Sequence, residues 1–194
     1  MTTAPTKLAL SGDDAADRLL AADPLALLIG MALDQQIPLE RAFKSPLDLK
    51  ERLGGTLDAV EIANYDPDEL SLIFRQPPAL HRFPAANAKR VQDLCRMIVD
   101  DYDGRADAVW TSAATGAALY ANVRALPGFG DQKARIFVAL LGKQLGATPD
   151  GWEQAAGDYG APGVYMSVAD IVDADTLRRV RAYKAELKAK AKRT

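Results

Sequence analysis

Apolar side chains recur along this chain at the three- and four-residue spacing that is typical of amphipathic helices. One long segment of this kind spans residues 84–102, where Ala88, Val91, Cys95 and Ile98 fall on one face. No run of four to eight residues alternates between apolar and polar positions as a half-buried strand would. The pattern therefore predicts an all-α fold.

Capping residues and prolines mark where several of these helices should begin. The pairs Asp23-Pro24, Ser45-Pro46 and Asp66-Pro67 each join a capping side chain to a proline at the first helical position. Ser11 predicts an earlier, short helix, and Gly54-Gly55 should close the helix that begins at Ser45-Pro46. The helix after Asp23-Pro24 is almost wholly apolar, so we expect it to be the core of the N-terminal part.

Residues 126–130 read Leu-Pro-Gly-Phe-Gly and lie between two helical stretches, 113–125 and 131–144. With Gly128 and Gly130 able to take positive φ, this segment can join back-to-back helices through a hairpin whose backbone N–H groups face outward. Such a hairpin suits a phosphate. An ordinary corner between two helices uses Pro-Gly as well, so the pentapeptide alone leaves both interpretations open.

Length and charge limit the possible classes of protein. A chain of 194 residues with 48% hydrophobic content can bury a core as one domain, or as two small lobes that share a cleft. Its 24 basic and 26 acidic residues nearly cancel, so any binding to DNA must come from local patches. A basic end, which includes Lys184, Lys188, Lys190, Lys192 and Arg193, is typical of a solvated helix terminus.

Candidate metal and cofactor sites are few. The single cysteine, Cys95, excludes an internal disulfide framework and a four-cysteine zinc or iron–sulfur site. The only histidine, His81, has no cysteine or acidic neighbour, which favours a structural interpretation. No apolar stretch approaches the roughly 20 residues needed to cross a bilayer. We therefore expect a cytoplasmic protein that has no membrane partner and uses no metal, iron–sulfur cluster or nucleotide cofactor.

The run Leu-Pro-Gly-Phe-Gly-Asp-Gln-Lys-Ala at 126–134 resembles the hairpin of the helix-hairpin-helix (HhH-GPD) DNA glycosylase superfamily, and of its endonuclease III-like members in particular. The resemblance implies a single domain over 1–194 with two helical lobes that flank a cleft, and a helix-hairpin-helix motif at 113–144. Within it, 24–125 would be mostly core helices, 126–157 the hairpin, its second helix and a catalytic loop, and 173–194 a basic C-terminal helix.

The resemblance also implies a function and a set of site residues. The function is base excision repair of double-stranded DNA by an N-glycosylase. Gln35 and Gln36 are similar to the family's pair at the cleft, which helps to fill the gap left by an everted base. The residues expected to contact DNA are Leu126, Pro127, Gly128, Phe129, Gly130, Gln132, Lys133, Gln35 and Gln36.

The family spacing, counted from Gln132 at the position of the family's hairpin lysine, reaches Asp150 as the catalytic aspartate. An aspartate there would stabilise the positive charge that develops on the sugar or would activate water. The alternative is that Asp150 caps the short helix that follows it.

Departures from the family pattern bear on the reaction. Gln132 cannot act as an amine nucleophile, and Lys133, one residue along the helix, is rotated by about 100° and is expected to point away from that place. We therefore expect a monofunctional glycosylase that removes a base with water and lacks AP-lyase activity. The alternative is a non-catalytic helix-hairpin-helix protein that binds DNA.

Overall fold

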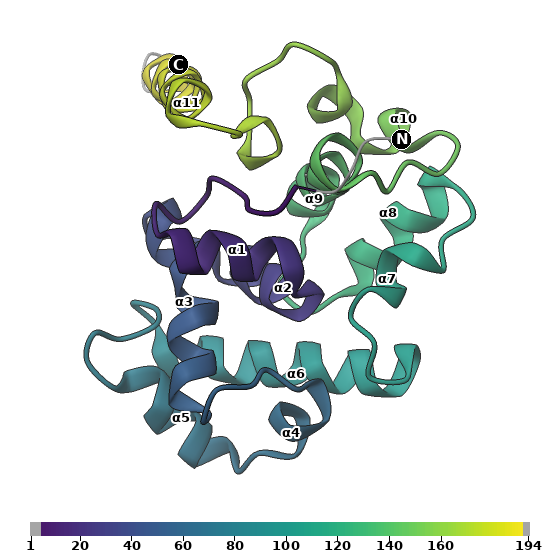
Figure 1. Ribbon diagram of the computed structural model, residues 1–194. Coiled ribbons are helices and arrows are strands. Elements are labelled where there is room, and N and C mark those ends of the chain that lie inside the picture. Colours follow the sequence, from purple (N-terminus) through teal and green to yellow (C-terminus); the bar gives the residue numbers. More distant parts are fainter. Residues whose placement is uncertain (1–4, 192–194) are drawn as a thin grey trace.

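The computed structural model describes residues 5–191, which fold into helices arranged as two lobes (Figure 1). Apart from an isolated bridge between Thr115 and Asp150, no strand occurs in this range. The predicted all-α fold is confirmed. The finer division of the chain into segments within a single domain stays a prediction.

The first lobe consists of the first six helices, and α3 to α6 form the lower part of Figure 1. Its helices are α1 (Asp14–Ala22), α2 (Pro24–Leu33), α3 (Leu39–Arg52), α4 (Ala59–Asn64), α5 (Pro67–Arg75) and α6 (Pro84–Tyr102).

The second lobe lies above it and includes the hairpin, with α11 at the opposite upper edge of the view. Its elements are α7 (Ala108–Thr111), α8 (Gly116–Ala125), α9 (Asp131–Leu145), α10 (Trp152–Ala156), the 3₁₀ turns η1 (Gly157–Gly160) and η2 (Val168–Asp170), and α11 (Ala174–Ala191). Neither lobe contains a described helix with both the length and the apolar character that a membrane span requires.

Helix α2 is buried in the core of the N-terminal part, as its apolar sequence predicts. All of its residues except Pro24 are buried, and the Asp23 carboxylate caps it by accepting from the N–H groups of Leu25 and Ala26. Gly30 packs so closely that an added Cβ would lie 2.9 Å from a ring carbon of Phe43. The end of α2 is therefore held rigidly against the core.

The predicted helix start at Ser45-Pro46 is wrong, because α3 begins at Leu39 and runs through Pro46. A proline inside a helix loses one backbone hydrogen bond. Two features offset that loss: Phe43 and Leu49 are fully buried, and the Ser45 hydroxyl donates to the carbonyl groups of Arg41 and Leu80 at 2.8 Å each. The expected stop at Gly54-Gly55 is confirmed, since the Gly55 N–H donates to the Lys50 carbonyl.

Of the other predicted helix boundaries, some agree with the structure and some are shifted by a few residues. The cap of α1 is Asp13 rather than Ser11, whose hydroxyl instead accepts from the Asp13 N–H. The ranges of α6 and α9 agree with the sequence pattern to within one residue. The stretch predicted from residue 113 begins only at Gly116, where the Thr115 hydroxyl caps α8. Lys192 and Arg193 of the predicted basic tail lie outside the described residues.

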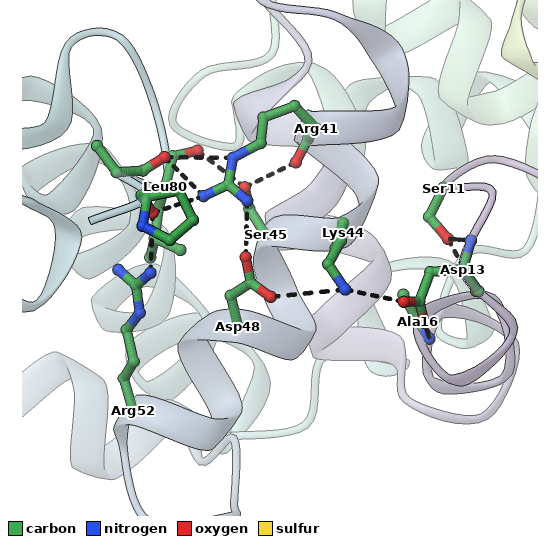
Figure 2. A network of polar contacts seen from close by, with 11 residues as sticks. Ser11, Asp13, Ala16, Arg41, Lys44, Ser45, Asp48, Arg52 and Leu80 are labelled. Atoms are coloured by element: carbon green, nitrogen blue, oxygen red, sulfur yellow. Dashed lines mark hydrogen bonds and ion pairs between the residues drawn. The ribbon is translucent and has the colours of Figure 1, made fainter. Parts of the chain in front are cut away.

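A network of polar contacts fastens residues 78–80 to α3 (Figure 2). The Arg41 guanidinium donates to the carbonyl groups of Pro78 and Ala79 and pairs with Asp48 at 2.7 Å. Arg52 donates to the Pro78 carbonyl as well. Together with the bond from Ser45 to Leu80, these contacts fix the segment that leads into His81.

Candidate functional site

A cavity of about 550 Å³ opens where the end of α2 meets the start of α9, which is within the size range of small-molecule sites. Residues from four parts of the chain line it. They are Met31 and Asp34–Gln36 from the end of α2, Gly128 and 130–133 with Ile136 from the hairpin and α9, Tyr159 with 166–168, and Tyr183, Lys184 and Leu187 from α11. We refer to this space as the cleft.

The hairpin presents its backbone and buries its apolar side chains. Gly128 has a φ of 90°, as the tight turn requires, whereas Gly130 has a φ of −75°, so the expectation of positive φ is wrong for Gly130. An added Cβ at Gly130 would meet nothing within 4 Å. Leu126 and Phe129 are buried in the core, so these two expected DNA contacts can reach DNA only through their backbone.

The first turn of α9 leaves room for an anion. Its N-cap, Gly130, has no side chain to occupy the terminal N–H groups, which carry the positive end of the helix dipole. The nearby Asp131 carboxylate is engaged by the Tyr120 hydroxyl and by Arg135, and these bonds hold the pKa of Asp131 below its usual value. The hairpin thus retains the geometry of a phosphate site although it carries an acidic residue.

Asp34 brings a carboxyl group to the floor of the cleft. It is the C-cap of α2, and burial raises its pKa, an effect that the charges of Lys184 and Lys133 partly offset. A carboxyl group whose pKa is raised keeps its proton to a higher pH than a free aspartic acid does, which favours a role in proton transfer. Asp34 is therefore equipped for acid–base chemistry.

Lys133 enters the same cleft, so the expectation that it points away is wrong. Its Nζ donates to the Ala32 carbonyl at 3.2 Å, on the buried side of α9. Burial lowers the pKa of Lys133 to about 8, with a further lowering from Arg90, while the charge of Asp34 acts in the opposite direction. A substantial fraction of this amine is thus uncharged at mildly alkaline pH, and the uncharged form is the one in which an amine is a nucleophile.

The all-α fold agrees with a comparison against known families. The family model of HhH-GPD superfamily base excision DNA repair proteins matches residues 29–194. The chain belongs to this superfamily. No curated protein and no solved structure matches it. The HhH-GPD family are DNA glycosylases that act in base excision repair, so this membership places the chain among DNA-binding hydrolases.

The HhH-GPD hairpin brings most of the expected DNA contacts to the cleft. Gly128, Gly130, Gln132, Lys133 and the pair Gln35-Gln36 all line it. Gln132 and Lys133 can do so together because the cleft lies over the first turn of α9. The Gln132 side-chain amide donates to the Tyr159 hydroxyl at 2.8 Å, which fixes its direction.

Asp150, the predicted catalytic aspartate, lies outside the cleft, so the structure does not bring it together with the hairpin residues that line the cleft. Asp150 is exposed and is not among the residues that line the cleft. Its carbonyl group accepts from the Gly116 N–H at 2.8 Å, and a Cβ on Gly116 would meet the Gly151 backbone at 2.3 Å. The loop that carries Asp150 is therefore locked onto the start of α8.

Sequence reasoning missed Asp34, Tyr159 and Tyr183 as cleft residues. For Asp34 a signal existed, because a carboxylate at the C-terminal end of an apolar helix opposes the helix dipole and calls for an explanation. No sequence signal indicated that α11 would reach the cleft. Between Pro5 and Ala191 no group of three or more His, Cys, Asp or Glu side chains is arranged to hold a metal ion.

Proposed function

We propose that the chain is a DNA glycosylase that hydrolyses the N-glycosidic bond of a damaged or mismatched base in duplex DNA, with the cleft as its active site. The observation that carries this proposal is the placement of Asp34 and Lys133 in one cavity beside the hairpin. The hairpin N–H groups would hold a backbone phosphate while the target nucleotide leaves the base stack and enters the cleft.

Asp34 would stabilise the charge on the sugar, the role predicted from the sequence for Asp150, and would also act as the acid. In its protonated form Asp34 donates its proton to the departing base as the bond from the base nitrogen to the sugar C1′ breaks. The carboxylate that remains stabilises the positive charge on the sugar until water adds to C1′ and loses a proton. These reaction steps remove the base and leave the DNA strand intact, as expected of a monofunctional enzyme.

A second candidate reaction is favoured by the lowered pKa of Lys133. In this route the uncharged amine attacks C1′, the base leaves with a proton, and the nitrogen forms an imine with the opened sugar. An imine of this kind permits subsequent cleavage of the strand, so the enzyme would be bifunctional.

One set of assays separates the candidates. Purified protein is incubated with duplexes that carry uracil, alkylated purines, oxidised bases or mismatches, and abasic sites are then cut with alkali. Asp34→Asn should reduce the product at least about 100-fold, the contribution expected of a positioned acid or base. The matched control, Asp150→Asn, should retain activity. Loss of activity in that variant alone would show that Asp150, and not Asp34, is the catalytic aspartate.

Borohydride distinguishes the two reactions, because it reduces an imine to a stable bond between protein and DNA. A trapped complex that disappears in Lys133→Met supports the bifunctional route, while alkali-dependent product without trapping supports hydrolysis. If no lesion is processed but salt-sensitive binding to duplex DNA persists and falls in Gly130→Asp, the chain is a non-catalytic DNA-binding protein.

A further inference from the structure

The histidine of this chain joins the end of α2 to the start of α6. His81 is only 3% exposed. The backbone N–H of Phe83 donates to its Nδ1 at 3.1 Å, so the ring hydrogen is on Nε2, and Nε2–H donates to the Gln35 carbonyl oxygen at 2.9 Å. A single neutral tautomer thus satisfies both ring nitrogens.

Two further side chains extend this junction to the hairpin. The Asn87 amide donates from Nδ2 to His81 Nδ1 at 2.8 Å, and its Oδ1 accepts from Arg90 at 2.6 Å. Arg90 also approaches the side-chain oxygen of Gln35 at 3.4 Å. Its aliphatic stem lies on Gly128, where an added Cβ would be 2.7 Å from the Arg90 Cδ. We call His81, Asn87 and Arg90 the His81 junction.

The turn that this junction holds has an unusual backbone. Gln36 has a φ of 61°, a left-handed conformation that costs energy for a residue with a side chain and persists only where the surroundings enforce it. Gln35 and Gln36 are exposed at the edge of the cleft, directly after Asp34. Strained residues of this kind cluster at sites of function.

We propose that His81 is a positioning residue for base eversion: through its hydrogen bond to the Gln35 carbonyl group, it holds the Gln35-Gln36 turn ready to enter the space that the everted nucleotide leaves. This inference rests on the proposed function. His81 itself touches neither the nucleotide nor the sugar. Its contribution is to keep the turn from relaxing when DNA is absent, so that binding does not have to order it.

The charges around the ring favour the neutral tautomer, in which Nδ1 accepts from the Phe83 N–H and Nε2–H donates to the Gln35 carbonyl group. Burial lowers the pKa of His81, and the cations Arg90, from α6, and Lys133, from α9, act in the same direction, while the bond to the Gln35 carbonyl opposes them. An imidazolium would carry a hydrogen on Nδ1 and could no longer accept from the Phe83 N–H. Protonation would therefore disturb the junction at Nδ1.

Two substitutions separate the ring nitrogens. In His81→Gln the terminal amide nitrogen occupies the place of Nε2 and can still donate to the Gln35 carbonyl. In His81→Asn the shorter side chain can still accept at the place of Nδ1 but cannot reach Gln35. Both variants remove a buried ring, so a comparable loss of thermal stability is expected in each, and Lys89→Gln on the exposed face of α6 serves as an inert control.

The probe is a duplex of about 25 base pairs with one central tetrahydrofuran abasic analogue, compared with the same duplex undamaged. The ratio of the two dissociation constants, measured by fluorescence anisotropy, reports the turn, while binding to undamaged DNA reports the hairpin. His81→Asn should lower the ratio about tenfold, as loss of one buried hydrogen bond does, and His81→Gln should retain it.

The outcomes distinguish this inference from the proposed function. If the wild type prefers the abasic analogue and both variants lose that preference in proportion to their stability, His81 is merely structural and the inference is overturned. Equal preference in both variants and the wild type overturns it too. If the wild type shows no preference for the analogue and processes no lesion, the proposed function itself has failed.

Discussion

Replacing Lys133 by methionine should make the protein more stable at neutral pH. Burial lowers the pKa of this lysine from 10.5 to about 8, a change of about 2.5 units. At roughly 1.36 kcal/mol per unit, holding the buried ammonium costs the native state about 3 kcal/mol. Methionine has a similar length and no charge, but it gives up the hydrogen bond to the Ala32 carbonyl, worth about 1 kcal/mol. The net gain expected is about 2 kcal/mol.

The pH dependence gives the sign of this effect. Below pH 8 both the native and the unfolded wild type carry the proton on Lys133, so the native state bears the whole cost. Between pH 8 and pH 10.5 the native state releases the proton while the unfolded chain retains it, so the stability of the wild type rises relative to the variant. The advantage of Lys133→Met should therefore be full at pH 6 to 7 and should shrink as the pH approaches 10.

Urea unfolding, followed by the helical circular dichroism signal at several pH values, measures both quantities. Lys89→Met is the matched control, because the side chain of Lys89 is 73% exposed and its pair with Asp93 lies on the surface. Its effect should stay within about 0.5 kcal/mol. A Lys133→Met variant that is less stable than the wild type at pH 7, or whose difference does not change with pH, would refute the argument that the amine is buried at a cost.

Three further predictions concern the elements that shape the cleft. Gly128→Ala should lower the free energy of unfolding by more than about 1 kcal/mol, because it combines a φ of 90° with a clash at Arg90. Gly130→Ala, whose added methyl group meets open space, should lower the free energy of unfolding by no more than about 1 kcal/mol. Thermal unfolding of both variants measures the difference. Asp170→Asn should cost about 3 kcal/mol in urea unfolding, because it breaks a buried pair with Lys143 that holds the turn before η2. Arg41→Ala should speed amide exchange at Leu80, whose segment it fastens, by roughly tenfold, and unchanged exchange would contradict that account.

Local signals in the sequence predicted most of the helices. Asp23-Pro24 and Asp66-Pro67 mark real starts because the capping carboxylates bond to N–H groups within the next turn. Ser45-Pro46 has the same local pattern, yet it lies inside α3. The difference comes from residues 39–44, where burial of Phe43 extends the helix backwards, and local signals do not report burial.

The candidate site was only partly predictable, for a similar reason. The hairpin and Gln35-Gln36 carry their own sequence patterns, and residues of both line the cleft, while their contact with DNA stays a prediction. The direction of Lys133 depends on where α2 and α11 lie around α9, which is tertiary information. The family spacing, counted from Gln132, led to Asp150. Spacing along the chain does not report tertiary packing, which here places the loop against Gly116 and the Trp152 ring against Gly142.

The burial of α2 has a consequence for how this protein could change during evolution. Asp34 ends a helix that is nearly inaccessible to solvent, so a substitution that shifts α2 displaces the acid and damages the core at once. The opposite side of the cleft is formed by Tyr183, Lys184 and Leu187 of α11, a helix in which only Val180 is buried. Substitutions at Tyr183, Lys184 and Leu187 should therefore disturb the core less than substitutions in α2. Libraries that vary these three residues are the place to start when the preferred base is to be changed.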